Sequence, residues 1–89
     1  MELKEAFEQA VTESKALPRK PDNEQLLELY ALYKQATEGN VNEQTPKPQL
    51  FDFIGKAKYD AWSAKKGLSS DDAMSAYIAL VAQLQQILS

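Results

Sequence analysis

The sequence predicts an all-α protein, a four-helix bundle. Apolar residues recur at helical spacing in four segments, and no segment shows the strict alternation that is typical of a strand. Capping residues and helix-ending proline or glycine separate the four segments. A chain of 89 residues has room for one core, so we expect a single domain over residues 1–89.

The first two helices are predicted over residues 2–16 and 22–39. Leu3, Phe7 and Val11 mark the apolar side of the first, and Pro18 ends it. Asp22 is an N-cap residue with Gln25 three positions later, which is the spacing of a capping box. More than half of the second helix is apolar, so we expect it to pack on two sides.

The third helix is predicted over residues 52–65 and the fourth from the capping run at residues 69–72. Gly67 ends the third helix. Helical spacing places four of its residues on one side: Ile54, Ala57, Ala61 and Trp62. The apolar spine of the fourth consists of Met74, Tyr77, Val81, Leu84 and Leu88. Residues 40–48 form a loop long enough to cross the bundle, which would allow the second and third helices to run parallel.

Composition excludes several functional classes. The chain has neither histidine nor cysteine, which removes the commonest general base, the commonest metal ligands and thiol nucleophiles. A net charge of −3 argues against nucleic acid as a partner. No apolar run is long enough to span a bilayer, and the N-terminus does not resemble a signal peptide. We therefore expect no catalytic residues, no metal, no cofactor, no integral membrane segment and a cytoplasmic location.

Three groups of residues could form a site for an anionic, partly apolar ligand. Tyr30, Tyr33 and Lys34 lie near one helical face, and Lys58 is four residues from Trp62. A third, basic group at the end of the first helix consists of Lys15, Arg19 and Lys20. The alternative interpretation is structural: amphipathic side chains at the edge of a core, and lysines that are only solvated.

The motifs resemble those of the acyl-CoA-binding protein family over nearly the whole chain. The resemblance is carried by LLELYALYKQATEGNVN at residues 26–42, DFIGKAKYDAW at 52–62 and DAMSAYI at 72–78. It implies an up-down-down-up order of helices. It also implies reversible, non-catalytic binding of medium- to long-chain fatty acyl-CoA esters by an intracellular carrier and pool former.

The resemblance also implies roles for individual residues. Tyr30 would contact the adenine, Lys34 would pair with the 3′-phosphate and Lys58 would assist at the headgroup. Leu26 and Leu27 would line the acyl groove. The remaining implied site residues are Ala10 and Lys15 from the first helix, Tyr77 from the last, and Tyr33 with one edge in the site; Trp62 is expected in the core.

The chain departs from the family pattern near the third helix. Ile54 stands where many members have lysine, and Tyr59 stands where tryptophan is common. The loop at residues 45–51 is longer than usual and carries Lys47 in place of a common glycine. These changes bear on affinity and on chain-length preference.

Two other functions are open to the sequence. Residues 73–89 carry no charge, which would suit a helical protein–protein adaptor, although Gln83, Gln85 and Gln86 can solvate this helix instead. We expect a monomer, with this helix as the surface for any weak self-association. A thioesterase is disfavoured because histidine, cysteine and a Gly-x-Ser-x-Gly elbow are all missing.

Overall fold

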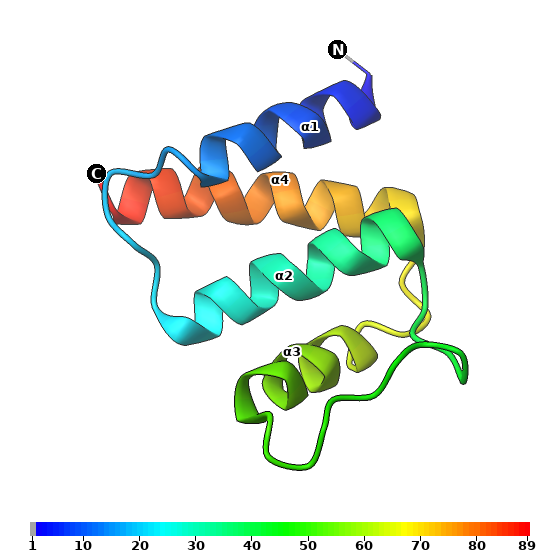
Figure 1. Cartoon of the computed structure of the whole chain (residues 1–89). Coiled ribbons are helices and arrows are strands. Elements are labelled where there is room, and N and C mark those ends of the chain that lie inside the picture. The colour runs from blue at the N-terminus through cyan, green and yellow to red at the C-terminus, as the bar shows by residue number, and fades with distance from the viewer. Residues whose placement is uncertain (1) are drawn as a thin grey trace.

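The computed structural model describes residues 2–89 and consists of four helices and their connections (Figure 1). The helices are α1 (Leu3–Ser14), α2 (Asn23–Glu38), α3 (Phe53–Ser63) and α4 (Ser70–Ile87). In Figure 1, α1 and α4 run in one direction while α2 and α3 run in the other, so α2 and α3 are parallel. The predicted all-α class and up-down-down-up order are confirmed.

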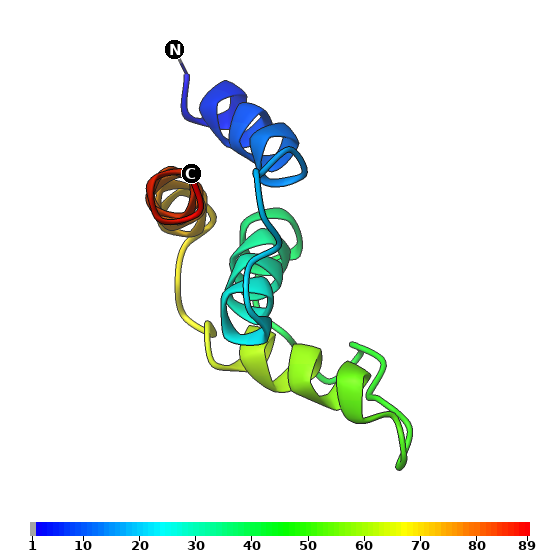
Figure 2. The same ribbon diagram turned by 90° about the vertical axis from the view of Figure 1, so that its left-hand side faces the viewer.

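The four helices form a flat, elongated arrangement. Helix α4 packs against both α1 and α2, and α3 packs against α2 alone. The view in Figure 2 places α3 and the loop that precedes it at one end of the molecule and α1 at the other. The principal dimensions of 37 × 28 × 16 Å reflect this arrangement. Helix α2 therefore packs on two sides, as its apolar surface predicts.

The core lies among α1, α2 and α4. Its largest members include Phe7 of α1, Leu32 of α2, and Tyr77, Val81 and Leu84 of α4, all of which are buried. Helix α3 buries only Trp62 to the same degree. The apolar stripe of α4 is thus explained by its position, since this helix packs against two neighbours at once.

The predicted helix ends at Asp22, Gly39 and Ser69 are confirmed. The Asp22 carboxylate accepts a hydrogen bond from the backbone N–H of Gln25 at 2.8 Å, and the Gln25 side chain accepts one from Asp22 at 3.0 Å. The Ser69 hydroxyl accepts from Asp72 N–H at 3.1 Å. Gly39 has a φ of 80°, a conformation that glycine adopts without a steric penalty.

Three predictions differ from the structure. Helix α3 ends at Ser63 rather than residue 65, because Lys65 and Lys66 donate to carbonyls three residues back. Helix α1 ends at Ser14 rather than residue 16, because Lys15 and Ala16 donate to carbonyls three residues back and so form a tightened turn. Ile54, predicted on the packed side of α3, is 72% exposed. The reason is that α3 has one helical neighbour, whose side chains near Ile54 line an open groove.

Polar contacts hold the loop between α2 and α3 to the connection between α3 and α4. Gln35 is buried, and its Nε2 donates to Asn40 Oδ1 at 2.7 Å and to the carbonyl of Leu68 at 2.8 Å. Asn40 Oδ1 also accepts from Gly67 N–H at 2.9 Å. These bonds fix where the crossing loop begins and where α3 leads into α4.

Candidate functional site

A pocket rich in lysine lies between α2, α3 and the loop that joins them. We call it the lysine pocket; its volume is about 310 Å³, and its lining includes Tyr30, Lys34, Lys47, Lys58, Tyr59 and Trp62. Helix α2 supplies the first two of these residues, the loop supplies Lys47 and α3 supplies the rest. Its three lysines outnumber the two carboxylates of the lining, Glu38 and Asp52, which makes the pocket a candidate site for an anion.

Two of these lysines lie over aromatic rings. The Nζ atom of Lys34 is 4.9 Å from the centroid of the Trp62 ring, and that of Lys58 is 5.3 Å from the centroid of Tyr30. Both distances are within the range of cation–π attraction. The pocket thus combines ammonium groups with aromatic rings, a combination suited to a base that carries phosphate.

Glu38 is the ion-pair partner of Lys34. The two side chains form an ion pair one turn apart on α2, and the hydrogen bond from Lys34 to this carboxylate raises the pKa of Lys34 above its ordinary value, against the opposing effect of burial. The ion pair therefore favours the protonated form of Lys34. A phosphate ligand would compete with Glu38 for this ammonium group.

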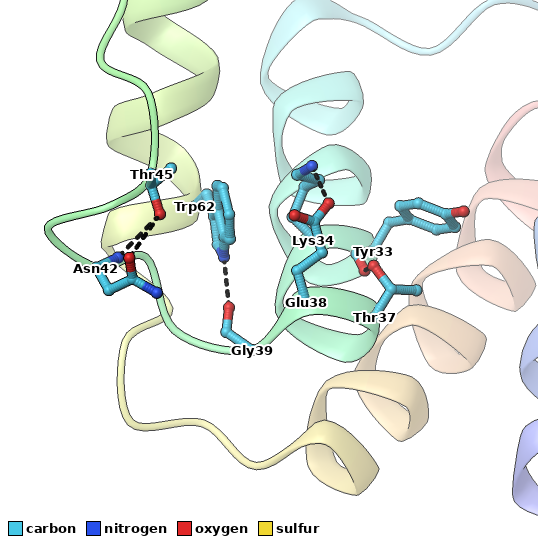
Figure 3. Close-up of polar contacts among 8 residues, drawn as sticks. All are labelled: Tyr33, Lys34, Thr37, Glu38, Gly39, Asn42, Thr45 and Trp62. Atoms are coloured by element: carbon cyan, nitrogen blue, oxygen red, sulfur yellow. Dashed lines mark hydrogen bonds and ion pairs between the residues drawn. The ribbon is translucent and has the colours of Figure 1, made fainter.

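Figure 3 shows how the backbone around the pocket is held. The indole N–H of Trp62 donates to the carbonyl of Gly39 at 2.8 Å, which ties α3 to the end of α2. In the loop, Asn42 N–H donates to the Thr45 hydroxyl at 3.0 Å. Lys34 lies on the same side of α2 as Trp62, whereas Tyr33 points away from it, toward α4.

An apolar groove continues from the lysine pocket. This groove has a volume of about 400 Å³ and lies between the first half of α2 and the first half of α3. Its apolar lining consists of Leu26, Leu27, Phe53, Ile54 and Ala57. Tyr30 and Lys58 line both the groove and the lysine pocket. A ligand with an anionic head and an apolar tail could therefore occupy both cavities at once.

The structure brings five of the nine predicted site residues together here. Tyr30, Lys34 and Lys58 line the lysine pocket, and Leu26 and Leu27 line the groove. Tyr33 instead stacks on Phe7 at 5.9 Å between ring centroids, and lines a separate cleft beside α1. Its place on the other side of α2 follows from the rotation of about 100° between successive helical residues.

The other three predicted residues belong to α1 and α4. Ala10 and Tyr77 are 3% and 4% exposed, respectively, in the core. The Tyr77 hydroxyl donates to Ser14 Oγ at 3.1 Å, and burial raises the pKa of this phenol. Lys15 is exposed just beyond the end of α1. None of the three lines the lysine pocket or the apolar groove.

Several residues that line the lysine pocket or the apolar groove lie outside the predicted site. Trp62 was expected in the core; it is buried and also lines the lysine pocket. Phe53, Ala57 and Ile54 share the face of α3 that carries Lys58, and their helical spacing was the available signal. Lys47 and the loop prolines have no such signal, because the loop is not periodic. Within residues 2–89, no group of acidic side chains could hold a metal ion.

No helix in the part of the chain that the structure describes has the length and apolar character needed to cross a bilayer.

Comparisons with known proteins agree with this architecture. The family model described as "Acyl CoA binding protein" matches residues 4–81. Acyl-CoA-binding protein homolog 1 of Caenorhabditis elegans is 51% identical over 79 residues, which cover 89% of this chain and 90% of that protein. The acyl-CoA-binding protein of Ricinus communis is 50% identical over 84 residues, with coverage of 94% and 91%.

Solved structures show the same fold. The crystal structure of Oryza sativa acyl-CoA-binding protein 2 superposes with a TM-score of 0.89 at 43% identity, covering 97% of this chain and 93% of that one. The structure from Moniliophthora perniciosa superposes with a TM-score of 0.88 at 35% identity, covering all of this chain and 85% of the other.

Proposed function

Because this chain belongs to the acyl-CoA-binding protein family, we propose that it binds fatty acyl-CoA esters reversibly and carries them without chemical change. The observation that carries the proposal is the shared wall of the two cavities. Tyr30 and Lys58 border both a lysine-lined pocket and an apolar groove, which match the two halves of such an ester. The adaptor function has no comparable support, since α4 is occupied by packing against α1 and α2.

Each half of the ester has its own residues in this proposal. Lys34 and Lys58 bind phosphate, and Tyr30 stacks with the adenine; Lys47, which lines the same pocket, supplies a third cation. Leu26 and Leu27 contact the acyl chain, together with Phe53 and Ile54. Medium- to long-chain esters are the class that the family resemblance implies. Ala10, Lys15, Tyr33 and Tyr77 stay as predictions from family resemblance.

Tight binding requires both halves of the ligand. A charge-assisted hydrogen bond contributes about 1.5–3 kcal/mol, and each buried methylene contributes about 0.8 kcal/mol. The headgroup and the acyl chain are covalently linked, so the second contact forms without a second loss of translational entropy. Free CoA and free fatty acid should therefore each bind far more weakly than the ester.

The proposal includes no catalysis and no cofactor. The chain lacks histidine and cysteine, and the lysine pocket presents ammonium groups and aromatic rings rather than an activated nucleophile. We propose that the protein acts as a monomeric carrier in the cytoplasm. Fractionation of cells and sedimentation of the purified protein test these two points separately.

The deciding experiment is calorimetric titration with palmitoyl-CoA below its micelle concentration. CoA and palmitate serve as the matched controls. We expect one-to-one binding of the ester and much weaker binding of either half. Comparable affinities for CoA and palmitoyl-CoA would show that the apolar groove is not used. No binding of the ester would overturn the proposed function.

A further inference from the structure

The lysine pocket contains a carboxylate that opposes the anion the pocket is suited to bind. Glu38, the last residue of α2, lines the pocket together with Lys34, and the two side chains form an ion pair across one helical turn. Figure 3 shows this pair on the side of α2 that faces Trp62. The Nζ atom of Lys34 is 4.9 Å from the centroid of the Trp62 ring, so the ammonium group that Glu38 engages belongs to the wall of the pocket.

Glu38 differs from the other carboxylate of the lining. Asp52 accepts a backbone N–H at 2.9 Å and so caps the start of α3, whereas the Glu38 carboxylate is engaged by Lys34. Among residues 2–89, Lys47 and Lys58 take part in none of the ion pairs. In the described part of the chain, Lys34 is therefore the one lysine of the pocket that has an acid as its partner.

The energetics of α2 give no reason for an acid at position 38. The C-terminal end of a helix carries partial negative charge, which disfavours a carboxylate there. The pair runs from lysine to glutamate along the helix, which is the less favourable of the two orders. The Glu38 side chain is also 54% exposed, so it contributes little to packing. The effect of Glu38 is therefore concentrated on Lys34, and a neutral side chain at this position should not weaken the helix.

Binding of a phosphate to Lys34 exchanges one anion for another. Without ligand, the ammonium group already has the Glu38 carboxylate as its partner, and the hydrogen bond between them raises the pKa of Lys34. A phosphate therefore gains only the difference between its own interaction with Lys34 and the one that it displaces. A carboxylate that stays beside the bound phosphate also repels it, since both are negative. Both effects lower the affinity for the phosphate.

We propose that Glu38 is an internal counter-ion that competes with the ligand phosphate for Lys34 and keeps the affinity of the site below what its three lysines would give. This inference rests on the proposed function, because the phosphate belongs to the CoA headgroup. The competition suits a carrier that must release its ligand. When the headgroup leaves, Lys34, whose side chain is 23% exposed, regains a partner at once instead of remaining an uncompensated charge.

Calorimetric titration of variants that remove one charge tests the competition. The ligands are palmitoyl-CoA and its 3′-dephospho form, both below the micelle concentration. Glu38→Gln removes the carboxylate and keeps the size of the side chain. Glu28→Gln is the matched control, because Glu28 also lies on α2 and also forms an ion pair, with Lys65 at 2.6 Å, but lines neither the lysine pocket nor the apolar groove.

We expect Glu38→Gln to bind palmitoyl-CoA about threefold to tenfold more tightly than the unmodified protein. Its affinity for the dephospho ester should not change, and most of the gain should disappear when Lys34→Ala is also present. Glu28→Gln should leave both affinities as they are. The proposal is overturned by an equal gain with the two esters, by the same gain in Glu28→Gln, or by unchanged or weaker binding of palmitoyl-CoA to Glu38→Gln.

A headgroup fragment without an acyl chain, adenosine 3′,5′-bisphosphate, separates this proposal from the proposed function. Its binding is followed through the NMR signal of the Lys34 ammonium group, and Glu38→Gln should bind it more tightly than the unmodified protein. If no protein binds the ester but this difference holds, the carrier function fails and the competition stands. If the ester binds but Glu38→Gln shows no gain with either ligand, the competition alone fails.

Discussion

The two packed sides of α2 differ in what they do. On the side facing α1 and α4, Leu29, Leu32 and Ala36 are buried in the core. On the side facing α3, Leu27, Tyr30 and Lys34 are only partly covered and line two connected cavities. One helix therefore contributes to stability through one stripe of residues and to ligand binding through another. Residues on the binding side can therefore be changed with little effect on folding.

Truncation of a leucine on each side tests this separation most strongly. Leu32→Ala removes a side chain that is 3% exposed and should lower the free energy of unfolding by about 2–5 kcal/mol. Leu27→Ala should lower it much less, because this side chain is half-buried at an open groove, but should weaken palmitoyl-CoA binding. Urea unfolding and calorimetry measure the two effects. Equal losses of stability would contradict a division between the two sides.

Substitution of Lys34 tests the side of α2 that faces α3. Lys34→Ala should weaken binding of the ester by roughly tenfold to more than a hundredfold, because a charge-assisted contact is worth about 1.5–3 kcal/mol. The loss of its exposed ion pair with Glu38 should change stability by less than about 1 kcal/mol.

Lys4→Ala is the control for Lys34→Ala, because Lys4 lies on α1, outside both cavities. Calorimetric titration of the two variants side by side gives the comparison. Equal losses of affinity would place the phosphate elsewhere.

The smallest expected effect is the alkaline pH dependence of stability, which arises from a tyrosine in the core. Burial raises the pKa of Tyr77 above 10.0, so the folded protein disfavours the phenolate that the unfolded chain forms freely. The contribution of this group to the free energy of unfolding is therefore fully present below pH 10.0 and is lost as the pH rises beyond that value. The raised pKa of Lys34 acts in the same sense above 10.5.

Tyr77→Phe should reduce this alkaline decline, with a loss of about 1 kcal/mol at neutral pH from the missing hydrogen bond to Ser14. Ser14→Ala removes the same bond but keeps the phenol, so its alkaline decline should persist. Urea unfolding across the alkaline range provides the measurement. An unchanged profile in Tyr77→Phe would show that another group causes the decline.

Much of the fold follows from local signals. Asp22 with Gln25, Gly39 and Ser69 mark helix ends through bonds or backbone angles that involve only neighbouring residues. Helical spacing also places Tyr77 on the apolar spine of α4, but its hydrogen bond to Ser14 does not follow in this way, because it depends on α1, which is distant in sequence. Spacing within α2 groups Tyr33 with Tyr30 and Lys34. It does not show that Tyr33 faces α1, where it stacks on Phe7.

The candidate site was predictable in part. Tyr30, Lys34 and Lys58 could be grouped from helical spacing and family resemblance, and the structure brings them to one pocket. The position of Lys47 is set by a loop whose course is fixed by Asn42 and Thr45 and by the ties at Asn40, none of which shows a periodic pattern. The exposure of Phe53 and Ile54 depends on how little of α3 its neighbour covers.

The packing of α4 against both α1 and α2 also bears on how the chain folds during synthesis. Translation proceeds from the N-terminus at about 5–20 residues per second. The core side of α2 and the apolar side of α1 have no helix to bury them until residues 70–87 have been made. The core therefore cannot assemble while the chain is still growing through its first three helices, and cooperative folding follows the emergence of α4 from the ribosome.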